Sequence, residues 1–277
     1  MTTSRRSFRT LFLVAALGAV AYDPERSLAA VQTAGRTPSV ASPTPGELLR
    51  VDFDDLGRAR SAGTGPVTLA NEGSEPLAFR VSAAGGGILR SVPGNAGGYA
   101  ARFPAFAAGY TQRAVITATS SSDDDPLSPG DSDFTFGSDF TLDKVSEGGT
   151  ADNGNNVVQR GLFADPSQYK IQIDHGRASC RVAGSAGAAV VRSTQVITAD
   201  AWYRISCSRT TRTLALALGR VDGAITRTSV SARTGVVDSA NSTPLSLGGK
   251  VTGTGKVVAG NSDQFNGALD NVFLRLD

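Results

Sequence analysis

The residues with the most definite chemistry in this 277-residue chain are Cys180 and Cys207, its only two cysteines. Each lies in a segment where apolar and polar residues alternate, as in a half-buried strand. Two such cysteines can form one disulfide bond in an oxidising compartment, or stay as buried thiols in a reducing one. With a single histidine beside them, they are too few for a multi-cysteine zinc module or a three-histidine metal site.

Nucleophilic catalysis has little support in the sequence. A serine triad would need the one histidine, His175, which lies in the tripeptide Asp174-His175-Gly176. A tripeptide of this kind is typical of a hairpin turn. The chain also lacks a G-x-S-x-G nucleophile elbow. We therefore expect His175 to be a turn residue and not a catalytic base.

The elements that must position any site are predicted to be strands. Glycine and proline are abundant, with 32 and 12 residues, and hydrophobic residues make up 40% of the chain. Apolar and polar residues alternate in short segments, at 49–53, 79–81, 99–103, 134–142, 169–173, 203–207, 214–218 and 272–276. Such patterns, separated by turn residues, predict an all-β fold, an antiparallel two-sheet sandwich. Gly137 is expected to mark a bulge or bend.

The amino terminus has the pattern of an export signal. Arg5, Arg6 and Arg9 precede the apolar run 11–21, which is too short to span a bilayer. The paired arginines resemble a twin-arginine signal, while Sec export and an uncleaved anchor stay open. We predict a signal peptide at 1–29 with cleavage after Ala21 or Ala29, a disordered linker at 30–47 and one domain at 48–277. The protein is then secreted or associated with the cell envelope, without a membrane span.

Export changes the interpretation of both the charge and the cysteines. The formal charge of +2 comes from the predicted signal peptide, because the rest of the chain has equal numbers of acidic and basic residues. That balance gives no support for nucleic-acid binding. In an exported protein two cysteines favour a disulfide, so we predict a Cys180–Cys207 bond joining neighbouring strands.

Four segments between Asp133 and Asp277 resemble laminin-G-like (LamG) domains of the concanavalin A-like lectin/glucanase superfamily. They are the strand 133–135 (DFT), the hairpin from 156–161 (NVVQRG) to 168–171 (QYKI), the strand 202–205 (WYRI) and the closing strand 265–272 (FNGALDNV). The placement of the cysteines is similar to that in secreted actinobacterial proteins of this type. The resemblance implies a jelly roll of two curved antiparallel sheets.

The resemblance also implies a partner and an ion. LamG-like domains suggest a non-catalytic binding or adhesion module, with glycan or cell-envelope polysaccharide as the expected ligand. A structural calcium is implied at Asp54 and Asp270, where it would join the two ends of the domain. No other cofactor is expected.

Two alternatives to a glycan-binding module stay open. Glucanases of the superfamily use paired acids in an E-x-D-x-(x)-E pattern, which this chain lacks, so we predict no enzyme activity. Acids distant in the sequence can nevertheless converge. The second alternative is a cell-surface structural component without a small ligand. Phe163, Tyr169, Trp202 and Tyr203 are the aromatic candidates for stacking on a sugar, but Tyr169 and Trp202 are expected in the core and no aromatic cluster defines a site.

Overall fold

The computed structural model describes residues 44–105, 111–146, 154–240, 242–258, 260 and 262–277. The predicted signal peptide at 1–29 and most of the predicted linker at 30–47 lie outside the described residues. The described part belongs to one compact unit, Val40–Asp277, in which strands form two antiparallel sheets. None of its described helices is long and apolar enough to cross a membrane. The predicted all-β fold class is confirmed.

The first sheet, which we call the β8 sheet, has the strand order β15-β14-β13-β8-β17-β6-β5-β2, and β1 pairs with β17 beside this path. Because β1 and β17 are antiparallel neighbours, the two ends of the domain lie together as predicted. The strands are β1 (Glu47–Val51), β2 (Ser61–Ala62), β5 (Leu89–Pro93), β6 (Tyr99–Arg102), β8 (Phe134–Leu142), β13 (Tyr203–Arg209), β14 (Thr213–Arg220), β15 (Ile225–Ser231) and β17 (Gly267–Leu276).

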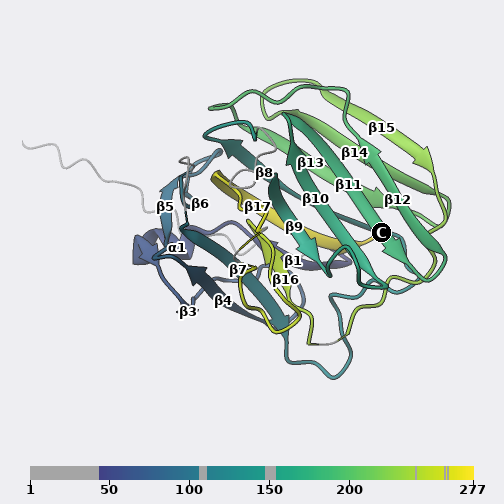
Figure 1. Ribbon diagram of the computed structural model, residues 1–277, viewed down its shortest axis with the longest axis horizontal. Helices are drawn as coiled ribbons and strands as arrows, with labels where there is room; N and C mark the ends of the chain where they lie inside the picture. Colours follow the sequence, from purple (N-terminus) through teal and green to yellow (C-terminus); the bar gives the residue numbers. More distant parts are fainter. Residues whose placement is uncertain (1–43, 106–110, 147–153, 241, 259, 261) are drawn as a thin grey trace, which may run out of the picture. The chain divides into compact units, whose positions relative to one another are not determined.

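The second sheet, the β10 sheet, has the order β12-β11-β10-β9-β16-β7-β4-β3. Figure 1 shows β4, β7, β16 and β9–β12 following one another across the molecule. The strands are β3 (Gly65–Pro66), β4 (Leu77–Ala84), β7 (Arg113–Ser120), β9 (Asn155–Arg160), β10 (Gln168–Asp174), β11 (Arg177–Gly184), β12 (Gly187–Arg192) and β16 (Leu245–Leu247).

The core lies between the inner faces of the two sheets. Phe134 and Phe136 of β8 pack against Tyr169 of β10, with ring centroids 5.7 and 5.0 Å from that of the tyrosine. All three side chains are 0% exposed. The Tyr169 hydroxyl donates a hydrogen bond to the Leu127 carbonyl at 2.9 Å, which satisfies its polar end inside the core. The alternation at 169–173 therefore predicts the core face of β10 correctly.

Two local expectations are wrong. Phe53 does not continue the first strand, because it has φ of 65° and precedes the short helix α1 (Asp54–Ala59), whose first turn carries two acids that suit a helix N-terminus. Gly137 marks no bulge, since β8 is regular there and the irregularity lies opposite, in β17 between Asp270 and Phe273. A Cβ at Gly137 would lie 2.2 Å from the Ile205 carbonyl oxygen, so glycine permits the close approach of β13.

Candidate functional site

A cavity of about 430 Å³ lies on the outer face of the β10 sheet, over β9 to β12. Alternate residues of a strand point to opposite faces, and in β10 the buried residues Tyr169 and Ile171 leave Lys170 and Gln172 on the outer face. We call this space the cation cavity because its charged lining consists of Lys170, Arg181, Arg192 and Lys250. Amides of glutamine complete much of the polar lining, at Gln159, Gln168 and Gln172.

Two lysines of the cation cavity share one carboxylate. The ammonium groups of Lys170 and Lys250 each lie 3.1 Å from Oδ2 of Asp263. Burial lowers the pKa of Lys170, Asp263 opposes this shift, and the charges of Lys250 and Arg181 add to it. One carboxylate can neutralise only one ammonium, so this cluster retains positive charge that an anion would offset.

Arg181 and Phe163 form the opposite side of the cation cavity. The guanidinium of Arg181 lies over the ring of Phe163, 4.5 Å from its centroid, and donates a hydrogen bond to the Gln168 side-chain oxygen. This stacking orients the arginine, while Phe163 itself stays 78% exposed. An exposed aromatic ring beside a fixed guanidinium offers an apolar surface and a planar set of donors to the same ligand.

The lining of the cation cavity can form hydrogen bonds and ion pairs with a ligand. Amide side chains both donate and accept hydrogen bonds, which suits hydroxyl groups, and arginine and lysine suit carboxylate or sulfate groups. Glycoside hydrolysis requires two carboxyl groups flanking the bond. None of the described residues lining this cavity has a carboxyl group, so the cavity does not provide that pair.

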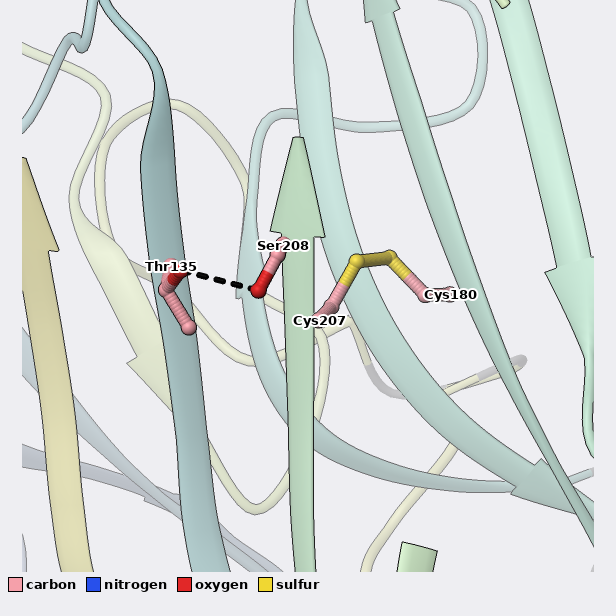
Figure 2. Close-up of a disulfide and its surroundings, with 4 residues drawn as sticks. All are labelled: Thr135, Cys180, Cys207 and Ser208. Carbon is pink, nitrogen blue, oxygen red and sulfur yellow. Dashed lines mark hydrogen bonds between the residues drawn. A yellow bond between two sulfur atoms is a disulfide. The ribbon is translucent and has the colours of Figure 1, made fainter. Parts of the chain in front are cut away.

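The disulfide lies directly beneath the cation cavity. Cys180 and Cys207 are bonded, with their Cα atoms 6.1 Å apart, so the predicted bond is confirmed. The prediction that it joins neighbouring strands is wrong, because Cys180 belongs to β11 of the β10 sheet and Cys207 to β13 of the β8 sheet (Figure 2). Cys180 points into the core while its neighbours Ser179 and Arg181 line the cavity. The bond therefore ties the floor of the cavity to the opposite sheet.

The predicted calcium ligands Asp54 and Asp270 both contact the β5–β6 hairpin. Oδ1 of Asp54 accepts a hydrogen bond from the Tyr99 amide at 2.7 Å. In Asp270, Oδ2 accepts from the Asn95 amide at 3.1 Å and Oδ1 from the Asn271 amide at 2.8 Å. Burial raises the pKa of Asp270 to about 6, and the charges of Asp139 and Asp52 contribute.

A cation would relieve the repulsion among these carboxylates, but the two predicted ligands supply only part of the six to eight oxygens that calcium takes. Backbone carbonyls and water would have to supply the others. Within the described ranges, no three or more histidine, cysteine or acidic side chains come together as a metal site. Calcium at Asp54 and Asp270 stays a prediction.

The remaining sequence candidates lie away from the cation cavity, with one exception. Tyr169 is in the core as expected, but Trp202 is only partly buried, because its neighbour Tyr203 occupies the core position and is 2% exposed. His175 lies in the β10–β11 turn, as expected, and is exposed. Only Phe163 lines the cavity.

Sequence reasoning missed the cations of the cavity. The outward position of Lys170 follows from the alternation in 168–173, and that signal was available in the sequence. Lys250 and Asp263 lie in irregular segments far along the chain, so no pattern in the sequence placed them beside Lys170.

The residues of the cation cavity lie within a segment of the chain that matches a known protein family. Residues 154–276 match the Laminin G domain family. This segment contains both cysteines and all the lining residues of the cation cavity, and it covers most of the region that resembles LamG domains. No curated protein matches the chain.

Two of three similar solved structures have TM-scores above 0.5 and share the fold at low sequence identity. The binding domain of Paraclostridial Mosquitocidal Protein 1 is 14% identical, with a TM-score of 0.53, over 84% of this chain and 49% of that one. The binding domain of Botulinum Neurotoxin DC in complex with SialylT is 9% identical, with the same TM-score and coverage. The LG1-3 region of the laminin alpha2 chain is 20% identical over 52% of this chain and 28% of that one, with a TM-score of 0.43. This chain spans half or less of the length of these structures.

Proposed function

We propose that this chain is a non-catalytic binding module that recognises an acidic glycan in the cation cavity. The observation that carries the proposal is the charge of the cavity. Lys170, Arg181, Arg192 and Lys250 line one space, and Asp263 is the carboxylate that pairs with two of them. Such an excess of one sign, in a concave site, favours a ligand of the opposite sign.

The other lining groups favour a sugar among anionic ligands. The side chain of Gln172 offers an amide donor and acceptor to hydroxyl groups. The amides of Gln159 and Gln168 bond within the protein and form a polar wall of the cavity. Phe163 offers an exposed ring to the apolar face of a sugar, next to the guanidinium of Arg181. A carboxylate or sulfate on the sugar would complete the set by pairing with the cations.

The sheet and the disulfide bond that hold the cavity residues in place suit a module that binds without catalysing. The sheet supplies the polar residues on a regular strand surface, and the Cys180–Cys207 bond anchors β11, next to the edge strand β12, to the β8 sheet. Rigid elements hold binding groups more accurately than loops do. Export through the predicted signal peptide would bring this surface to glycans outside the cell, either free or in the envelope.

A glycan array tests the proposal directly. The secreted protein should bind acidic glycans above neutral ones, and Phe163→Ala should weaken binding by roughly 3- to 10-fold, because it removes an aromatic contact and the support of Arg181. Ile225→Ala is the matched control, since Ile225 is an exposed apolar residue on β15 of the β8 sheet. An array without signal for any acidic glycan would overturn the proposal.

The same preparation separates the two alternatives. Release of reducing sugar from a bound glycan would identify a glycoside hydrolase. Co-purification with the cell envelope without any array signal would favour a structural component.

A further inference from the structure

A second cavity, of about 350 Å³, lies on the same outer face over β4 and β7. We call it the hydroxyl cavity, because serine and threonine side chains dominate its polar lining, with two cations at Arg80 and Lys256. The hydroxyl groups come from both strands and from the loops above them, at Ser82, Thr117, Thr119 and Thr254. Hydroxyl groups donate and accept hydrogen bonds, so this surface also suits a sugar.

A hairpin formed by residues 250–258 lies between the two cavities. Its two halves are joined by a bridge between Val251 and Val257, and the Val257 amide donates a hydrogen bond to the Ser82 hydroxyl of β4 at 3.1 Å. Lys250 and Val258, at the base of the hairpin, line the cation cavity. Residues 253–256, at its tip, line the hydroxyl cavity.

Two further spaces near the hairpin tip share lining residues with the two cavities. A third cavity of about 340 Å³, the loop cavity, is lined by residues of the loop 162–167, by residues 238–240 and 242–243, and by Gly253. A small space of about 10 Å³, with Gln159, Leu162 and Gly253 in its lining, shares residues with both the loop cavity and the cation cavity, so a ligand would pass over it at the surface. Gly253 also lines the hydroxyl cavity, so it stands where the spaces meet.

We propose that these cavities are subsites of one groove that binds a linear acidic polysaccharide across the β10 sheet, around the tip of the 250–258 hairpin. This inference rests on the proposed function and extends it from a single sugar to a polymer. The strands from β12 to β4 are separated by six inter-strand intervals, a span of about 29 Å at the usual strand spacing. A ligand that occupies both ends gains affinity from the second contact without any new interaction at the first.

The charges along the groove indicate which sugars lie where. The two ends carry the cations, at Lys170 and Lys250 in one cavity and at Arg80 and Lys256 in the other. The loop cavity between them carries the carboxylates Asp165 and Asp238 instead. Acidic sugars are therefore favoured at the ends of the groove and neutral sugars at its middle.

A large side chain at position 253, in place of Gly253, would block the groove. A Cβ at this residue would meet no atom within 4 Å, and its φ does not require glycine. A large side chain at 253 would therefore extend into open space without straining the hairpin. Gly223, in the β14–β15 turn of the β8 sheet, is a matched control, because a Cβ there meets only Arg220, at 3.4 Å or more.

The experiment compares fragments of two lengths on three proteins. Titration calorimetry would measure binding of two hyaluronan fragments, a disaccharide and a long fragment, in which uronic acids alternate with neutral sugars. Each fragment is titrated into the secreted protein, Gly253→Trp and Gly223→Trp. In the unsubstituted protein the long hyaluronan fragment should bind about a hundredfold more tightly than its disaccharide, the low end of the gain from a linked second contact. Gly253→Trp should remove that difference and leave the disaccharide unchanged, whereas Gly223→Trp should change neither.

Three other outcomes would decide against the groove. Equal affinity for short and long fragments, or a length preference that survives Gly253→Trp, would overturn the polymer groove while leaving the cation cavity as a site for a single sugar. Absence of binding by every fragment, together with an array without signal, would overturn the proposed function itself. Lys256→Ala provides a second variant at the far end, where it should weaken only the long fragment.

Discussion

Two regions of the molecule each contain several charged groups of one sign, but they differ in how exposed these groups are. On the β10 sheet, the four cations of the cation cavity line an open space, and two of them, Lys170 and Lys250, share Asp263. On the β8 sheet, Asp139 and Asp270 lie directly opposite each other on β8 and β17 and are 1% and 3% exposed. Like charges in such a cross-strand pair repel. The first region leaves its excess charge accessible, and the second buries it.

The buried acids are compensated by groups of the protein itself. Arg204 donates two hydrogen bonds to Asp139, at 2.7 and 2.8 Å, and backbone amides of the β5–β6 turn and of Asn271 donate to Asp270. Buried charge must be satisfied internally, whereas exposed excess charge can be satisfied by a ligand. This difference supports the proposal that the cation cavity binds a ligand, whereas groups of the protein itself compensate the acidic pair.

The largest expected effect concerns the disulfide, which anchors only one of the two regions. Replacing both Cys180 and Cys207 by serine should lower the free energy of unfolding by about 3–4 kcal/mol, as expected for a loop of this size on the chain-entropy model. Urea unfolding measures the loss. Amide exchange should accelerate in β11 and β12 beneath the cation cavity and stay unchanged in β5 and β6.

Ser208→Ala is the control for the disulfide variant. It removes the 2.9 Å hydrogen bond to Thr135, on the other face of β13 from Cys207 (Figure 2), and should lower the free energy of unfolding by only about 1 kcal/mol. Equal losses in the two variants would contradict the role of the bond as the anchor of the cavity floor.

The second effect tests whether the acidic region also takes a ligand. If calcium binds at Asp54 and Asp270, calcium at about 100 times its Kd should raise the free energy of unfolding by roughly 2.7 kcal/mol. Thermal melts with calcium and with chelator would measure it, and Asp270→Asn should abolish the response while Asp222→Asn, in an exposed turn, should not. A melting temperature indifferent to calcium would leave both residues as acceptors for the amides of the β5–β6 hairpin.

Part of this contrast could be predicted from the sequence. The period-two pattern gave the strands, and the outward position of Lys170 follows from its place between the buried residues Tyr169 and Ile171. The sheet to which each strand belongs depends on pairing between distant segments, which is why the cysteines proved to join two sheets. The meeting of Lys170 with Asp263, 93 residues away, likewise depends on how the chain closes, and no local pattern encodes it.

The third effect is a pH dependence confined to the acidic region. The pKa of Asp270 is raised to about 6, chiefly by burial, from an ordinary value near 4. The folded state then binds a proton more tightly than the unfolded state, so this group makes the protein less stable as pH rises from about 4 to about 6. We expect a contribution of about 1–2 kcal/mol, smaller than the full shift because amide donors and solvent relax around the carboxylate.

Urea unfolding at several pH values, in the presence of chelator, measures this contribution. In Asp270→Asn the fall between pH 4 and 6 should be reduced relative to Asp222→Asn, which retains the buried carboxyl. An identical pH profile in the two variants would show that the folded protein does not raise the pKa of Asp270.

The smallest effect concerns the accessible cations, and it separates a binding surface from an ordinary charged face. Arg192 of β12 lines the cation cavity, whereas Arg227 of β15 lies on the β8 sheet, and both are exposed. Arg192→Ala should weaken binding of the acidic glycan with the strongest array signal by roughly 3- to 10-fold and make the affinity less sensitive to salt, because one charge contact is lost. Arg227→Ala has the same change of net charge, so it should leave affinity and salt dependence unaltered if binding depends on the cavity. Equal weakening by the two variants would mean that the net charge of the protein alone attracts the glycan. The cation cavity would then be an exposed charged surface without a specific role in binding.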